Sequence, residues 1–185
     1  MKVGVLALQG DFEAHASIVA ALDAVPVEVR TRAELEGVDA LIIPGGESTT
    51  IRKLAVRAGL IEPLRERAKS GMAILGTCAG LIACASEIAD GDEPIIGCLD
   101  VTVRRNAYGR QVDSFETDIE VVGIGAMHAV FIRAPRIERV GEDVEVLASH
   151  KGEPVVVRQG NIICSAFHPE LTGDSHLHAL ALRAR

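Results

Sequence analysis

Residues 73–81 read Ala-Ile-Leu-Gly-Thr-Cys-Ala-Gly-Leu, an apolar run that stops at a cysteine between two glycines. A segment of helical composition follows at once. This pattern is typical of a nucleophile elbow, a tight turn from a strand into a helix with the reactive side chain at its tip. Gly76 and Gly80 stand two residues on either side of Cys78 and let the helix approach the strand closely. The N–H groups and dipole of the helix favour the thiolate form of Cys78.

The segments before this elbow predict an α/β fold. Apolar runs at 3–8 and 41–43 are typical of strands buried on both faces of a parallel sheet, and 27–30 reads as a shorter strand. Asp11 is suited to cap a helix after the first of them. The strand–helix–strand order indicates layers joined by right-handed crossovers. Loops that follow parallel strands meet at one edge of a sheet, so we expect a site there.

From about residue 97 the pattern changes to strands without intervening helices. Thr, Asp and Glu alternate with apolar residues at 115–121, which indicates antiparallel strands with one solvated face. A helix is predicted from about 175 to the end of the sequence. The predicted strands of this part cover 99–104, 115–121, 129–132, 144–147, 155–158 and 161–167.

Composition limits the function. The 185 residues suit one domain, 1–185, and 48% hydrophobic residues are ample for a core. A net charge of −7 argues against nucleic acid or an anionic membrane as partner, and no signal peptide or spanning segment is evident. No C-x-x-C pair occurs, so we expect a reducing, cytoplasmic location. Three further cysteines are expected to pack as small apolar residues: Cys84, Cys98 and Cys164.

A glycine-containing loop, Pro-Gly-Gly-Glu-Ser-Thr-Thr at 44–50, follows the third predicted strand. Its N–H groups suit an oxyanion hole, although a simple glycine turn before a helix is an equally good interpretation. A phosphate-binding loop is disfavoured because the Walker lysine is missing. Ser48 or Thr49 is expected to cap the helix that follows. Glu47 suits acid–base chemistry, capping or ligand contact.

The last predicted strand leads into His168-Pro169-Glu170. The residue before a proline is extended, and side chains two apart in an extended chain lie on the same side. A histidine oriented by a carboxylate is what a nucleophilic cysteine needs as its base. A surface His-Pro turn is the alternative, and the elbow at Cys78 favours the catalytic interpretation. Metal binding by histidines near the C-terminus is disfavoured because no matching ligands precede them.

Three motifs in this order, Pro-Gly-Gly-Glu-Ser, Gly-Thr-Cys-Ala-Gly and His-Pro-Glu, resemble the class I (triad) glutamine amidotransferases. The stretches 8–11, 105–116, 130–135 and 167–172 more narrowly resemble the glutaminase subunits of pyridoxal 5′-phosphate synthase. The resemblance covers nearly the whole chain. It implies a flavodoxin-like three-layer sandwich with a mostly parallel central sheet and an antiparallel β extension.

The resemblance also implies roles for individual residues. Cys78 would attack the side-chain amide carbon of glutamine, His168 would carry the proton to the departing ammonia, and Glu170 would orient the imidazole. The N–H groups of Gly46 and Ala79 would form the oxyanion hole. No metal and no cofactor are implied.

Six residues are implied as glutamine-binding: Gly46, Glu47, Ser48, Arg105, Ile132 and Arg133. Their chemistry suits an amino acid, because arginine matches the α-carboxylate and an acidic side chain matches the α-ammonium. The sequence leaves open which arginine contacts the carboxylate.

Ammonia must reach its acceptor unprotonated, so a synthase docked over the active-site edge is expected. The resemblance implies a (β/α)8-barrel synthase subunit in a hetero-oligomeric complex. We expect the isolated chain to be weakly active and the partner to complete the oxyanion hole. The alternatives are a glutaminase feeding another synthase, such as imidazole glycerol phosphate synthase, a cysteine hydrolase of another group with a similar elbow, and a non-catalytic regulatory subunit.

Overall fold

The computed structural model describes residues 1–105 and 114–184. Its largest sheet has seven strands: β1 (Lys2–Leu6), β2 (Val25–Val29), β3 (Ala40–Ile43), β4 (Ala73–Thr77), β10 (Glu145–His150), β11 (Glu153–Gln159) and β12 (Ile162–Ser165). Their spatial order is β10-β11-β12-β4-β3-β1-β2. The five strands from β12 to β2 run parallel, and β11 is antiparallel to both β12 and β10. The predicted, mostly parallel sheet is confirmed.

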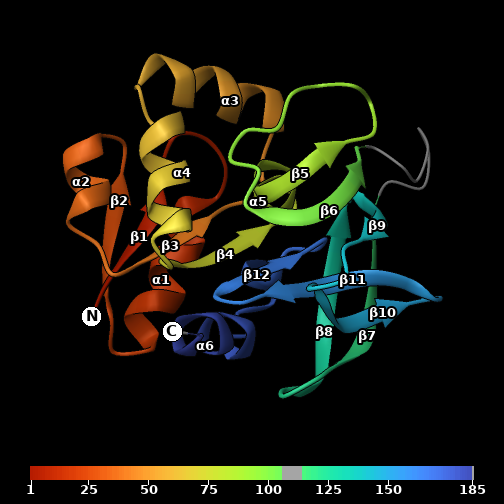
Figure 1. Ribbon diagram of the computed structural model, residues 1–185. Helices are drawn as coiled ribbons and strands as arrows, with labels where there is room; N and C mark the ends of the chain where they lie inside the picture. The colour runs from red at the N-terminus through yellow and green to blue at the C-terminus, as the bar shows by residue number, and fades with distance from the viewer. Residues whose placement is uncertain (106–113, 185) are drawn as a thin grey trace.

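Helices cover both faces of this sheet (Figure 1). On one face lie α1 (Phe12–Ala21) and α6 (His176–Arg183), and on the other lie α2 (Arg32–Glu36), α3 (Ser48–Arg57) and α4 (Ile61–Lys69). The short α5 (Ala79–Cys84) follows β4 directly. None of the helices described is long and apolar enough to cross a membrane.

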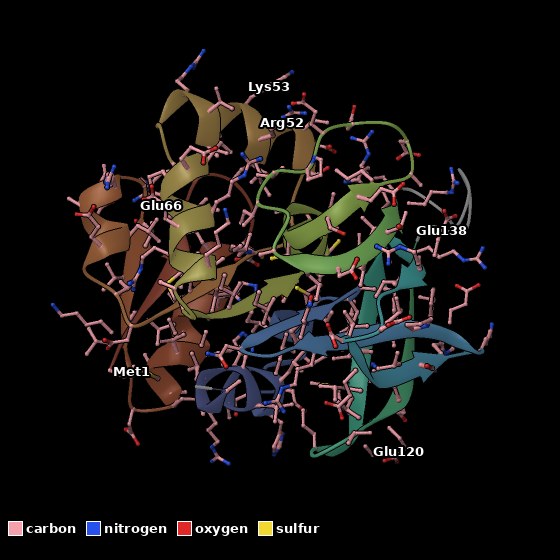
Figure 2. The ribbon with its side chains drawn as sticks, in the orientation of Figure 1. Met1, Arg52, Lys53, Glu66, Glu120 and Glu138 are labelled. Carbon is pink, nitrogen blue, oxygen red and sulfur yellow. The ribbon has the colours of Figure 1, made fainter. Side chains whose placement is uncertain are left out.

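The core follows from the apolar runs in the sequence. Every residue of β3 and β4 is buried, as both faces of a doubly covered sheet require. Each large aliphatic side chain buried there contributes about 1.5–3 kcal/mol. Charged side chains such as Lys53, Glu66 and Glu120 lie at the periphery of the molecule (Figure 2).

The β extension comprises two small sheets beside the large one. Three strands form the first, β5 (Ala85–Ile88), β6 (Leu99–Arg104) and β9 (Arg136–Val140), and a hairpin forms the second, β7 (Ser114–Val121) with β8 (Gly125–Ile132). The hairpin is antiparallel and β7 alternates in exposure, as predicted. Phe131 joins it to the large sheet, because its ring stacks 4.5 Å from Phe115 and lies 5.4 Å from Phe167.

Some elements differ from the sequence predictions. Asp11 caps α1 as expected, but the predicted cap of α3 by Ser48 or Thr49 is wrong, because the helix already begins at Ser48 with Glu47 at the N-cap position. Neither α2 nor the strands β5 and β9 was predicted. The pairing of β5 with β6 is parallel, so this small sheet is mixed rather than purely antiparallel.

Candidate active site

Three parallel strands deliver their loops to one edge of the large sheet. In the register of β3 with β4, Ile43 pairs with Gly76, and in that of β12 with β4, Ser165 pairs with Thr77. The N–H of Cys78 also donates to the carbonyl of Ser165 at 2.8 Å. The loops after β3, β4 and β12 therefore lie side by side at the carboxyl ends of the strands, where α/β proteins place their sites.

The turn at Cys78 has the backbone of a nucleophile elbow. Its φ of 50° and ψ of −102° lie in a region that side-chain-bearing residues rarely adopt. Close packing holds this turn in place. A Cβ on Gly80 would lie 2.0 Å from the carbonyl oxygen of Ile43, and one on Gly76 would lie 2.8 Å from that of Gly80. The predicted close approach of helix and strand is thus confirmed, and the thiol is buried at the edge of a pocket.

His168 and Glu170 are paired, though not in the predicted conformation. His168 Nδ1 lies 2.7 Å from Glu170 Oε1. The chain turns into a 3-10 helix, η1 (Pro169–Thr172), immediately after His168, so the extended chain expected through Glu170 is wrong. The turn from His168 into this tight helix brings the two side chains together instead. His168 is further fixed by its N–H, which donates to the carbonyl of Val130 in β8 at 2.9 Å.

The electrostatics of this pair favour its charged form. Burial alone would lower the pKa of His168, but hydrogen bonds and charge from Cys78 and Glu170 outweigh it and raise this pKa to about 10. Burial would raise the pKa of Glu170, but hydrogen bonds from His15 and His168 outweigh it and lower this pKa to about 2. The arrangement therefore stabilises an imidazolium between a carboxylate and the cysteine sulfur.

A pocket of about 220 Å³ opens in front of Cys78 and His168. The six residues predicted to bind substrate all line it: Gly46, Glu47, Ser48, Arg105, Ile132 and Arg133. The carbonyl of Ile132 lies 3.8 Å from the Cys78 sulfur, so the end of β8 forms one wall. The structure thus brings together the residues predicted for nucleophile, base and substrate contact.

The loop after β3 lies against both the elbow and the imidazole. The N–H of Gly45 donates to the Thr77 hydroxyl at 3.1 Å, and a Cβ at Gly45 would lie 2.3 Å from the His168 ring. Gly46 has a φ of 148°, and the next N–H, that of Glu47, donates to the side chain of Gln9 at 2.6 Å. The predicted oxyanion donors Gly46 and Ala79 both lie beside Cys78; their role stays a prediction.

The two arginines of the pocket differ in their partners. Arg105 is paired with Asp90 at 3.1 Å and with Asp92 at 2.7 Å. Arg133 is exposed, has a φ of 43°, and forms no ion pair within residues 1–105 and 114–184. Positions 106–113 of the motif that carries Arg105 lie outside the described residues.

Several residues at the site were not predicted from the sequence. Ile82 lines the pocket, and Thr77 bridges the elbow to the loop after β3. Behind Glu170, two buried histidines contact each other, His15 of α1 and His178 of α6. Their signal in the sequence is a polar residue on an apolar helical stripe: His15 lies three residues from both Phe12 and Ile18.

The remaining cysteines are separate from this chemistry. Cys84 and Cys164 are buried and Cys98 is half-buried, and all four cysteines are unpaired. Hydrogen bonding with Cys164, followed by burial, raises the pKa of the Cys84 thiol. In the described part of the chain, no group of three His, Cys, Asp or Glu side chains is placed to hold a metal ion.

Comparison with known proteins extends over nearly the whole chain. Residues 5–184 match the SNO glutamine amidotransferase family. The chain is 56% identical to the Mycobacteroides abscessus protein named pyridoxal 5′-phosphate synthase subunit PdxT, covering 96% of this chain and 94% of that protein. It is 55% identical to the Herpetosiphon aurantiacus protein of the same name, covering 98% of this chain and 99% of that protein. A crystal structure described as a glutamine amidotransferase superposes with a TM-score of 0.94 at 53% identity, covering 98% and 97%.

Proposed function

Because the chain belongs to the SNO glutamine amidotransferase family, we propose that it hydrolyses L-glutamine and supplies the ammonia for pyridoxal 5′-phosphate synthesis. The observation that carries this proposal is the His168–Glu170 pair, 2.7 Å apart, beside a cysteine held at positive φ. A thiol with a histidine base and a carboxylate that orients the base performs acyl transfer.

The reaction proceeds in two halves. The sulfur of Cys78 attacks the side-chain amide carbon of glutamine while His168 holds the thiol proton. The C–N bond then breaks, His168 passes the proton to the nitrogen, and ammonia leaves a glutamyl thioester. Water attacks the thioester, His168 takes its proton and returns it to the sulfur, and glutamate is released. Glu170 keeps the imidazole oriented throughout.

The pocket supplies substrate recognition and charge stabilisation. The N–H groups of Gly46 and Ala79 stabilise the oxyanion of each tetrahedral intermediate. Arg105 and Arg133 are the candidates for the α-carboxylate, and Glu47 attracts the α-ammonium. Glutamine then lies with its amide toward Cys78.

A partner completes the function. The relatives are named as subunits of pyridoxal 5′-phosphate synthase, and free ammonia at neutral pH is mostly ammonium, which is not a nucleophile. We infer a (β/α)8-barrel synthase subunit docked over the pocket edge, in the cytoplasm, that receives ammonia directly and completes the oxyanion hole.

Substitution of the nucleophile tests the chemistry. Cys78→Ala is expected to lower glutamine hydrolysis by at least about a thousandfold and to abolish labelling by an electrophilic glutamine analogue, read by mass spectrometry. Cys98→Ala is the matched control and is expected to keep both. Persistent labelling of the Cys78→Ala variant would show that the nucleophile is another residue.

Reconstitution tests the partner. Glutamate release is measured for the chain alone, with the barrel subunit of pyridoxal 5′-phosphate synthase, and with that of imidazole glycerol phosphate synthase. Only the first barrel is expected to raise the rate, and pyridoxal phosphate should then form. A full rate for the chain alone contradicts the dependence on a partner.

A further inference from the structure

Two histidines behind the active site have no assigned part in the proposed hydrolysis of glutamine. His15 and His178 are both fully buried, and neither lines the pocket. They lie on α1 and α6, 163 residues apart in the chain, yet His15 Nδ1 and His178 Nε2 are only 2.8 Å apart. Buried imidazoles are costly unless their nitrogens are used, so this pairing calls for a reason.

The other nitrogen of His15 faces the active site. His15 Nε2 lies 3.4 Å from Glu170 Oε2, and both side chains have no exposed surface. Glu170 Oε2 has no hydrogen-bond partner within residues 1–105 and 114–184, whereas Oε1 takes the bond to His168, so this 3.4 Å contact is the one that Oε2 makes there. Such contacts are often long in a ligand-free site and shorten when substrate binds. Support for this oxygen therefore comes from His15.

The donors and acceptors fix one arrangement of protons. An ionised carboxylate only accepts, so His15 Nε2 carries a proton toward Glu170. With its one ring proton at Nε2, His15 accepts at Nδ1, and His178 must donate from Nε2. Burial is the largest cause that lowers the pKa of His178, to about 3, so His178 is neutral. Its Nδ1, left as an acceptor, has no partner in the described chain.

Thr77 connects this pair of histidines to the rest of the site. Its hydroxyl lies 3.3 Å from His15 Nε2 and accepts from the N–H of Gly45. Thr77 immediately precedes the nucleophile, and Gly45 immediately precedes a proposed oxyanion donor. Displacement of His15 would therefore disturb Glu170, the elbow and the glycine loop together.

We propose that His15 and His178 are positioning residues of a buried relay, His178–His15–Glu170–His168, that fixes the tautomer and orientation of the base. This inference rests on the proposed glutaminase function. Each member donates one N–H to the next as far as Glu170, and His168 donates Nδ1–H to Glu170 from the other side. The lone pair of His168 Nε2 is thereby left for the thiol proton.

The first test needs no variant. Nitrogen-15 shifts of the histidine rings are measured by NMR in the full chain. The relay requires protonated Nε2 and unprotonated Nδ1 in both His15 and His178, and protonated Nδ1 in His168. A neutral His15 protonated at Nδ1 would overturn the proposal.

The second test measures kinetics in the complex with the synthase subunit. His15→Leu is expected to lower kcat roughly 100-fold and His178→Leu roughly tenfold, because small misplacements of catalytic groups are costly. The KM for glutamine should stay within about twofold, since neither residue lines the pocket. His178→Gln, whose amide can donate to His15, should restore most of kcat.

The matched control is His176→Leu, on the same helix but exposed and, among the residues that the structure describes, paired only with Asp174. It should leave kcat unchanged, and circular dichroism checks the fold of every variant. If the folded Leu variants keep the wild-type kcat, or if His178→Gln is no better than His178→Leu, the relay is wrong. If wild-type complex does not hydrolyse glutamine, the proposed function fails, while the ring-nitrogen measurement still decides the relay.

Discussion

On one side of the pocket, His168 and Glu170 are held by partners from α1 and β8, whereas on the other side Arg105 and Arg133 reach the pocket from the β extension. The Glu170 side chain has no exposed surface and that of His168 has 13%, against 22% for Arg105. Contacts to α1 and β8 fix the first pair: His15 lies 3.4 Å from Glu170, and the N–H of His168 donates to Val130. Arg133 has no ion-pair partner in the described chain.

This difference separates chemistry from recognition. The reacting groups are positioned by the large sheet and its helices, where a shift of one group moves several hydrogen bonds. The two arginines belong to the β extension, outside the large sheet, and can adjust to a ligand. Substitutions on the two sides should therefore affect different kinetic constants: kcat on the buried side and KM on the exposed side.

The largest effect is expected on the buried side. Glu170→Gln keeps the volume but removes the charge that stabilises the His168 imidazolium, so kcat should fall by at least about 100-fold with little change in KM. Steady-state kinetics of the reconstituted complex measures both constants. Glu120→Gln, on the exposed face of β7, is the control. A kcat within threefold of wild type would show that the carboxylate does not support the base.

A smaller effect is expected on the exposed side. Arg133→Gln should raise the KM for glutamine about tenfold and change kcat less, because the unpaired guanidinium is available to the α-carboxylate. Arg105→Gln should raise KM less, since Asp90 and Asp92 already pair with Arg105. The two variants are compared in the same assay. The reverse order would assign the carboxylate to Arg105.

The smallest effect is expected on the pH dependence of the free energy of unfolding. The folded pKa of His168, about 10, exceeds its ordinary value of 6.5. The contribution of His168 to the free energy of unfolding is therefore complete below pH 6.5 and is lost as the pH rises toward 10. The folded pKa of Glu170 is about 2, below its ordinary value of 4.5. Glu170 therefore stabilises the fold above pH 4.5, and this stabilisation is lost as the pH falls toward 2. Urea unfolding at pH 6 and 9.5 should show a loss in the free energy of unfolding that is smaller in His168→Asn. An equal loss in that variant would exclude His168 as its source.

Local signals were predictable from the sequence. The glycine spacing around Cys78, the cap at Asp11 and the apolar runs of β1, β3 and β4 each depend on neighbours in the chain, and the structure places them as expected. Helix α2 also had such a signal, because Thr31 and Glu34 form a capping box. The helix is only five residues long, and its apolar pattern is too short to be noticed.

Contacts between distant segments were not predictable. The relay joins His15 to His178 across 163 residues, and no periodicity in one segment reports on the other. The pairing of His168 with Glu170 was expected from an extended chain but arises in a 3-10 helix, since both conformations can bring such neighbours together. Short strands such as β5 and β9 depend on pairing with β6 rather than on their own sequence.

The register between β4 and β12 has a consequence for how such a molecule diversifies. Thr77 and Ser165 pair directly, so the nucleophile and the base are set by two adjacent strands. The described residues of the excursion 85–140, by contrast, form only the small sheets before the chain re-enters the large one at β10. Insertions or replacements within that excursion leave the β4–β12 pairing intact. The parts of the excursion other than β8 can therefore be remodelled for a different ammonia acceptor while the reactive edge is kept.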